Sequence, residues 1–183
     1  MSWQSYIDTM KSPDQSGTVP VAEAAICGIT PGQESVWVST PGLQGITVDE
    51  IKKLGSKDRS SFAQNGAYIG GTRCRLIRDQ MDMEPVYALD LKTAADADGN
   101  TFGVCVGKTK TAVVIAKGTK DASGGQISNK VFNVVEHLRK AGIKFEIRET
   151  RAAVAPSTGA VLKVQSSAVV SLSKRQQSRI TND

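Results

Sequence analysis

Apolar residues recur with the period of a helix near both ends of the first 143 positions. The N-terminal stripe consists of Trp3, Tyr6, Ile7 and Met10. The second stripe follows two glycines and consists of Ile127, Val131, Val134 and Leu138. Residues at these spacings share one face of an α-helix, so each stripe predicts an amphipathic helix.

Between the two stripes, short segments alternate apolar and polar residues, which is the pattern of half-buried β-strands. We expect strands over 24–29, 35–39, 72–78, 86–91, 101–106 and 111–117. No strand alternates with a long helix, and this order favours a mostly antiparallel sheet covered by helices over a parallel one. The predicted fold class is therefore α+β.

Two local signals refine this arrangement. Thr47 followed by Glu50 is a capping box, and with Gly55 as a C-terminal stop it predicts a short helix before this glycine. Asn65-Gly66 lies between two short runs, and this dipeptide is a strong signal for the turn of a β-hairpin.

The last forty residues differ from the rest in composition and charge. Residues 144–183 are rich in Ala, Ser, Val and Gln, contain Phe145 as their single aromatic residue, and show no sustained apolar period. They carry +4 of the net charge of +5. Such segments bury too little apolar surface to offset the entropy of folding, so we expect a domain over 1–143 followed by a basic, disordered extension. A strand over 159–167 is the alternative for part of it.

Few residues are suited to catalysis or metal binding. The single histidine, His137, has no GxSxG nucleophile motif to accompany it, and the cysteines lack the short spacing of a metal site. The cysteines are Cys27, Cys74 and Cys105. Because each lies in a strand-like stretch and their number is odd, we expect buried thiols rather than disulfides. The sequence predicts no catalytic residues, no metal site and no cofactor.

No segment of the sequence has the features of a secretory signal or a membrane span. The N-terminus is polar, and the longest apolar run, 112–116, is too short to cross a bilayer. We therefore expect a cytoplasmic protein. Because the excess positive charge belongs mainly to 144–183, we expect no nucleic-acid partner for the first 143 residues.

The run KDRSSFAQNGAYIGGTRCRLIRD, over 57–79, resembles the signature of animal profilins. Shorter segments resemble profilins in the same order, at 3–8, 35–37, 89–92, 101–102, 124–125 and 137–139. The resemblance spans 1–143 and implies a central antiparallel sheet, with the N- and C-terminal helices on one side and shorter helices on the other. It also implies a cytoskeleton-associated protein that binds monomeric actin and proline-rich actin-assembly factors.

The resemblance implies a groove for polyproline II segments, formed by Trp3, Tyr6, Trp37, His137 and Leu138. Such a ligand exposes carbonyl groups along its length, so its receptor needs flat aromatic faces with outward N–H and O–H donors. From the residues alone, the plainer interpretation is two core tryptophans and an exposed histidine at a helix end. Ile143 stands where profilins have a C-terminal tyrosine, and it lacks the hydroxyl group.

The resemblance further implies an actin-binding face that consists of Arg73, Leu76, Ile77, Arg78, Lys92, Thr101, Gly125 and Phe132. Basic residues around an apolar centre suit an acidic partner, although arginines also solvate ordinary sheet surfaces. Five matched positions differ from the commonest vertebrate residues: Ala63, Gln64, Ser128, Asn129 and Asn133. Truncated contacts at an interface centre cost about 1–3 kcal/mol, so we expect actin binding to be retained but weaker.

The cluster of Arg73, Arg75 and Arg78 suits phosphoinositide headgroups, which profilins also bind. The pair Gly70-Gly71 matches no phosphate-loop motif, so we expect a tight turn there. Three functions stay open at this point. The first is an adaptor for actin and proline-rich ligands, and the second is a membrane-surface module with actin binding lost or weakened. The third is a small-ligand sensor or enzyme on a similar α/β sandwich.

Overall fold

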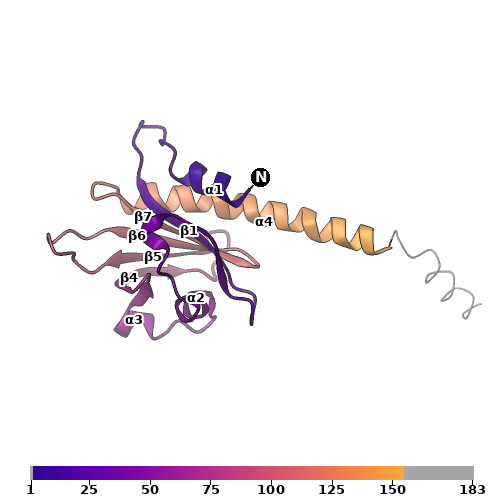
Figure 1. The fold of residues 1–183 in the computed structure, drawn as a ribbon, viewed down its shortest axis with the longest axis horizontal. Helices are drawn as coiled ribbons and strands as arrows, with labels where there is room; N and C mark the ends of the chain where they lie inside the picture. The colour runs from indigo at the N-terminus through magenta and orange to yellow at the C-terminus, as the bar shows by residue number, and fades with distance from the viewer. Residues whose placement is uncertain (1, 155–183) are drawn as a thin grey trace, which may run out of the picture. The chain divides into compact units, whose positions relative to one another are not determined.

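Within residues 2–154, which the computed structural model describes, seven antiparallel strands form one sheet (Figure 1). The strands are β1 (Val21–Gly28), β2 (Ser35–Ser39), β3 (Ala67–Ile69), β4 (Thr72–Gln80), β5 (Ala88–Thr93), β6 (Gly103–Lys108) and β7 (Ala112–Gly118). Their order across the sheet is β2-β1-β7-β6-β5-β4-β3, so β2 and β3 form its edges. The chain divides into two units, Met1–Lys140 and Ala141–Asp183.

The helices of the described residues are α1 (Trp3–Met10), the 3₁₀ turn η1 (Pro41–Leu43), α2 (Val48–Gly55), α3 (Phe62–Asn65) and α4 (Gly124–Val154). Figure 1 shows α2 and α3 on the side of the sheet away from α1. The hydroxyl of Ser2 caps α1 by accepting a hydrogen bond from the N–H of Ser5. Both helical stripes of the sequence are therefore helices, as predicted.

Each face of the sheet packs against its own apolar core. On one face, Met10 of α1 and Ile127 of α4 pack in a cluster with Val114 of β7. On the other face, Leu54 of α2 packs in a cluster with Ile115, the next residue of β7. Successive residues of a strand point to opposite faces, so this strand supplies both cores. The expected α+β sandwich is confirmed.

The central strands are buried on both faces, and this explains their sequence pattern. In β7, residues 112–116 are buried without a break. A strand covered on both faces has an uninterrupted apolar run, whereas a half-covered strand alternates. The longest apolar run of the sequence is therefore a central strand, and the clearest alternation occurs in β4 and β5, nearer the edge.

The capping box of α2 is present, and it also supports the β3–β4 turn. The Thr47 hydroxyl accepts from the N–H of Glu50, whose carboxylate accepts from the N–H of Thr47. The same carboxylate accepts hydrogen bonds from the N–H groups of Gly70 and Gly71, at 2.8 and 2.9 Å. The glycine pair is therefore a tight turn, as predicted, and its N–H groups already bind an anion from the protein itself.

The β3–β4 hairpin turns at Gly70-Gly71, so the prediction of a turn at Asn65-Gly66 was wrong. Asn65 ends α3, and Gly66 follows with a φ of 73° while its N–H donates to the Phe62 carbonyl. An Asn-Gly pair suits a helix end as well as a hairpin turn, because both need a left-handed residue. Gly70 and Gly71, with φ of 59° and 78°, supply that conformation at the hairpin itself.

Helix α4 continues to Val154, past the expected end of the domain. Residues 144–154, for which we expected no secondary structure, are rich in Glu, Arg and Ala. These residue types favour helix, and extending an existing helix needs no new nucleation. The domain boundary after Ile143 stays a prediction, and residues 155–183 lie outside the described residues, as does the expected strand over 159–167. None of the described helices is both long and apolar enough to cross a membrane.

Candidate functional site

Four aromatic rings from α1, β2 and α4 come together at one place. The ring centroids of Trp3 and Trp37 are 4.6 Å apart, those of Trp3 and Tyr6 5.9 Å, and those of Tyr6 and His137 5.7 Å. Trp3 and Trp37 are 40% and 36% exposed, whereas Tyr6 is 9% exposed. Leu138 packs against the core on the same face of the sheet. We call these five residues the aromatic cluster, and they are the five expected in the polyproline groove.

A β-bulge in β2 orients Trp37. Cys27 of β1 pairs with Val36, but the residue before it pairs with Val38, which leaves Trp37 as the extra residue. Bulges redirect a side chain in this way. The indole lies against Gly28, where an added Cβ would be only 2.6 Å from Trp37 Nε1. A glycine is therefore required beneath this ring.

Hydrogen bonds attach the loop after α1 to α4. They hold together the two helices that contribute to the aromatic cluster. Gln126 Nε2 donates to Asp14 Oδ2 at 2.9 Å, and Lys130 Nζ donates to Ser12 Oγ at 3.0 Å. Hydrogen bonds from Ser16 and then Gln126 lower the pKa of the Asp14 carboxyl to about 2. The carboxylate is therefore charged at neutral pH, which strengthens its hydrogen bond with Gln126.

The part of α4 around Arg139 is also attached to the sheet. The Arg139 guanidinium lies 3.3 Å above the ring centroid of Tyr87, and its Nε donates to the Lys108 carbonyl at 3.0 Å. Tyr87 has a φ of 47° and lies outside β5, which begins at Ala88, although the sequence predicted a strand from residue 86. The contact positions the turn of α4 that carries His137.

Two adjoining depressions over β4, β5 and the start of α4 contain most of the residues of the expected actin face. Their lining includes seven residues singled out from the sequence: Arg73, Arg75, Ile77, Arg78, Lys92, Thr101 and Gly125. We call these seven the basic face. Arg75, Lys92 and Thr101 line both depressions, so the two form one continuous surface.

A second bulge places Ile77 on this surface and Leu76 away from it. Leu76 pairs with Leu91 and Arg78 with Asp90, so Ile77 is the extra residue of β4. Ile77 is 55% exposed, whereas Leu76 packs against the core under α2. The structure therefore does not bring Leu76 together with the other residues expected to bind actin.

The charges of the basic face are only partly compensated. Arg78 Nη2 lies 2.7 Å from Asp90 Oδ2, and Arg73 Nε donates to a backbone carbonyl of α3. In the part of the chain that the structure describes, the side chains of Arg75 and Lys92 have no hydrogen-bond or ion-pair partner. A positive potential over an apolar centre results, and it suits an acidic surface.

Phe132 lies outside both depressions. It is on α4, two helical turns after Gly125, and is 37% exposed. Ser128, Asn129 and Asn133, which depart from the usual vertebrate residues, fall on the same side of the helix by their spacing. This strip of α4 extends the basic face along the helix.

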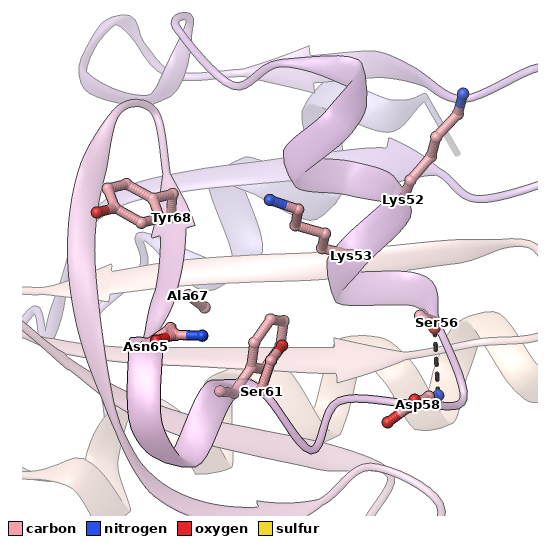
Figure 2. Close-up of a pocket in the computed structure, with 10 residues that line it drawn as sticks. Lys52, Lys53, Ser56, Asp58, Ser61, Asn65, Ala67 and Tyr68 are labelled. Carbon is pink, nitrogen blue, oxygen red and sulfur yellow. Dashed lines mark hydrogen bonds between the residues drawn. The ribbon is translucent and has the colours of Figure 1, made fainter.

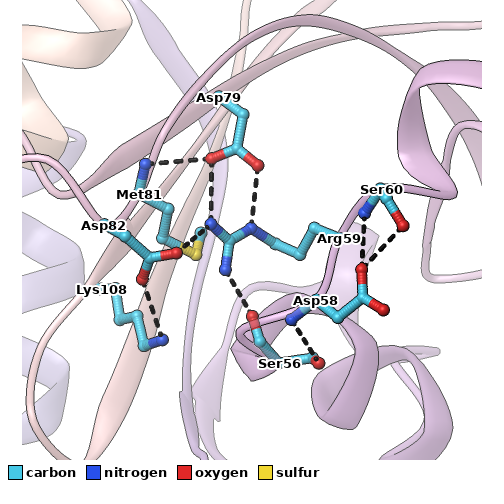
Figure 3. Close-up of polar contacts among 8 residues, drawn as sticks. All are labelled: Ser56, Asp58, Arg59, Ser60, Asp79, Met81, Asp82 and Lys108. Carbon is cyan, nitrogen blue, oxygen red and sulfur yellow. Dashed lines mark hydrogen bonds and ion pairs between the residues drawn. The ribbon is translucent and has the colours of Figure 1, made fainter.

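One buried charge cluster escaped the sequence analysis (Figure 3). Arg59 is 7% exposed, and its guanidinium donates to both oxygens of Asp79 and, at 2.6 Å, to Asp82. It also donates to the Ser56 carbonyl, and Lys108 lies 3.7 Å from Asp82. Burial lowers the pKa of Arg59, but the hydrogen bonds and charges of Asp79 and Asp82 outweigh the effect of burial, so the pKa is raised. The cluster links the loop before α3 to the end of β4. Nothing in the sequence indicated that Arg59 is buried, because it is a charged residue among polar neighbours.

All three cysteines are free and buried, as predicted. Burial raises the pKa of the Cys27 thiol to about 12 and that of Cys74 to about 11. The pKa of Cys105 is raised by burial and by the nearby Asp90 carboxylate. The thiols are therefore protonated at neutral pH and act as small apolar side chains.

Comparison with known proteins places the chain in a family. The family model named Profilin matches residues 1–143. Human Profilin-1 is 36% identical over 141 residues, which cover 76% of this chain and 96% of that protein. Rat Profilin-2 is 32% identical over 142 residues, which cover 76% and 97%.

Solved structures agree with this match. Mouse Profilin IIa, in complex with a double repeat from the FH1 domain of mDia1, superposes with a TM-score of 0.69 at 31% identity, covering 78% of this chain and 99% of that chain. Human profilin II superposes with a TM-score of 0.67 at 33% identity, covering 76% and 99%. With the fold, the sequence match and these superpositions in agreement, the chain belongs to the profilin family.

Proposed function

We propose that this chain is an adaptor that regulates actin polymerisation, binding monomeric actin through the basic face and proline-rich segments through the aromatic cluster. The observation that carries the proposal is the convergence of Trp3, Tyr6, Trp37 and His137 from three separate elements. Membership of the profilin family supports it, and one relative's structure is a complex with an FH1-domain repeat. The proposed role is cytoplasmic, cytoskeleton-associated and non-enzymatic.

The chemistry of the aromatic cluster fits a polyproline II ligand. Proline rings pack on aromatic faces, and the ligand's carbonyl groups need donors because proline supplies none between them. Within the described residues, neither indole N–H nor the Tyr6 hydroxyl has a hydrogen-bond partner in the protein. These groups are therefore available to ligand carbonyls, and the exposed faces of Trp3 and Trp37 are available to the rings.

The basic face fits an actin monomer for a different reason. Ile77 is an exposed apolar residue, and the side chains of Arg75 and Lys92, which are unpaired among the residues that the structure describes, lie around the same surface. An apolar centre with a basic rim combines burial of apolar area with electrostatic attraction to an acidic partner. In this proposal, stimulation of nucleotide exchange on actin is an effect of binding, which favours one actin conformation over another.

We propose phosphoinositide headgroups as a second ligand of the basic face. Arg73, Arg75 and Arg78 lie there together, and a cluster of exposed arginines attracts anionic lipid. Because the same residues are proposed to bind actin, the two ligands should compete. Vesicle binding that persists without any actin binding would instead favour the membrane-surface module.

The proposal is tested by tryptophan emission. Both tryptophans of the chain belong to the aromatic cluster, so emission reports directly on that site. A proline-rich peptide should change the emission of the unmodified chain, and Trp3→Ala should abolish peptide binding while actin sequestration is retained. Lys92→Glu should give the opposite result, with peptide binding retained and actin sequestration weakened. An unmodified chain whose emission does not respond to the peptide would refute the assignment of the cluster.

A further inference from the structure

A third depression lies between α2, α3 and the edge strand β3, over the core opposite the aromatic cluster. In Figure 2, Lys53 reaches across it toward Tyr68, and Asn65 faces it from the end of α3. Phe62 and Ala67 also line it and are only 4% and 2% exposed. The depression therefore has an apolar floor and a polar rim.

The charge of this depression is uneven. Lys52 and Lys53 both line it, and in the described part of the chain neither has a hydrogen-bond or ion-pair partner. They lie in the last turn of α2, where the helix dipole favours cations. Asp58 lines another part of it, and hydrogen bonds from Ser60 hold the pKa of that carboxyl below its usual range. One part of the depression is therefore positive and another negative.

The donors do not converge on a single anion. Figure 2 shows the ammonium groups of Lys52 and Lys53 pointing in different directions, one outward and one across the depression. The glycine turn of the β3–β4 hairpin, Gly70-Gly71, already donates its N–H groups to Glu50. A phosphate group needs several donors at one point, whereas separated cations suit carboxylates spaced along a chain.

The neighbouring sheet edge suits an extended chain. β3 is the last strand of the sheet, so only its β4 side is paired by a strand. Tyr68, its middle residue, is 48% exposed. Extended peptides bind to such edges through their main chain, and alternate side chains then reach adjacent pockets.

We propose that this depression binds an extended acidic segment of a partner protein, with its carboxylates on Lys52 and Lys53 and an apolar side chain over Phe62. The ligand residue nearest Asp58 is neutral or basic. Because the depression and the aromatic cluster lie on opposite faces of the sheet, the acidic segment does not compete with a proline-rich ligand.

The probe is a labelled peptide in which Glu alternates with Val and Thr, and the control replaces every Glu with Gln. Fluorescence anisotropy measures binding to the full chain, and amide NMR shifts locate it. The acidic peptide should bind and shift the amides of Lys53, Asn65 and Tyr68. The Gln peptide should bind about tenfold more weakly, because it lacks the charges that pair with the lysines.

A matched pair of variants tests the site itself. Lys53→Glu should weaken binding about fivefold or more, whereas Lys57→Glu, an equal charge change at an exposed lysine outside the depression, should change it less than about twofold. Equal losses in the two variants, or amide shifts confined to the basic face, would overturn the proposal. Displacement of the peptide from these amides by inositol trisphosphate would assign the depression to phosphate instead, and would also overturn it.

Discussion

At the scale of single residues, the aromatic cluster depends on a glycine that contributes no side chain to it. Gly28 lies beneath the indole of Trp37, and a Cβ at this position would be 2.6 to 2.7 Å from three of its ring atoms. Real Cβ contacts essentially never come so close, so the ring moves if the glycine is replaced. Because the ring of Trp37 lies 4.6 Å from that of Trp3, centroid to centroid, the displacement reaches the centre of the cluster.

We therefore expect Gly28→Ala to weaken binding of a proline-rich peptide by about tenfold, an effect of the size seen when an interface residue loses its place. Peptide titration followed by tryptophan emission measures this. Gly124→Ala is the matched control, because a Cβ there meets no atom within 4 Å. Equal affinities in the two variants would mean that the position of the Trp37 ring does not matter for the ligand.

At the scale of elements, hydrophobic periods predicted α1, α4 and the core strands, and a capping box predicted α2, but the sequence pattern predicted neither α3 nor the bulges. Val36, Trp37 and Val38 were predicted to lie in one regular strand, yet the inserted residue changes which face of the sheet each side chain joins. In β4, the inserted residue Ile77 likewise changes which face of the sheet the neighbouring side chains join. A bulge arises from pairing between strands that are distant in sequence, so its position is not encoded in the local pattern. Resemblance identified both residues, but only the sheet register explains their orientation.

Arg59 and Glu50 illustrate a second kind of feature that the sequence did not predict. Both are charged residues at or below 9% exposure, and each is stabilised by partners about twenty residues away. The capping box was visible in the sequence because its two residues are three positions apart. The contacts of Glu50 with the hairpin turn were not visible in the sequence, because they depend on how α2 packs beside β3.

The loop between α1 and β1 gives a pH-dependent prediction. Asp14 has its pKa lowered from 3.8 to about 2, first by Ser16 and then by Gln126. A lowered pKa in the folded state stabilises the protein above the unfolded value, and this contribution is lost as the pH falls through the folded value. The melting-temperature difference between the unmodified chain and Asp14→Ala should be constant above about pH 5 and should narrow between about pH 4 and pH 2. A difference that narrows instead toward alkaline pH would contradict this.

The extension after the domain gives a second prediction at this scale. We propose that residues 144–183 contribute little to the stability of residues 1–143, because they supply few large apolar side chains. Deletion of 144–183 should leave the melting temperature within about 2 °C and should weaken binding to phosphoinositide vesicles, because +4 of the net charge is removed. Calorimetry and vesicle sedimentation measure the two effects. A loss of several degrees, absent when only 155–183 is deleted, would show that 144–154 packs on the domain.

At the scale of the whole molecule, one sheet carries two separate surfaces. The aromatic cluster uses α1, β2 and the turn of α4 around His137, whereas the basic face uses β4, β5 and the first turn of α4. The two surfaces share no residue. The core strands β1, β6 and β7 join them, and these are the most completely buried strands of the sheet. In the proposed function, this separation lets actin and a proline-rich ligand bind without displacing each other.

The most direct test of this account is a calorimetric titration of a proline-rich peptide into the chain alone and into its complex with monomeric actin. We expect the same dissociation constant in both titrations, within about twofold, and retention of actin in the complex throughout. Trp3→Ala should remove the binding heat in both cases, which shows that the heat arises at the aromatic cluster. Release of actin by the peptide, or loss of peptide binding once actin is bound, would contradict the claim that this chain binds both partners at once.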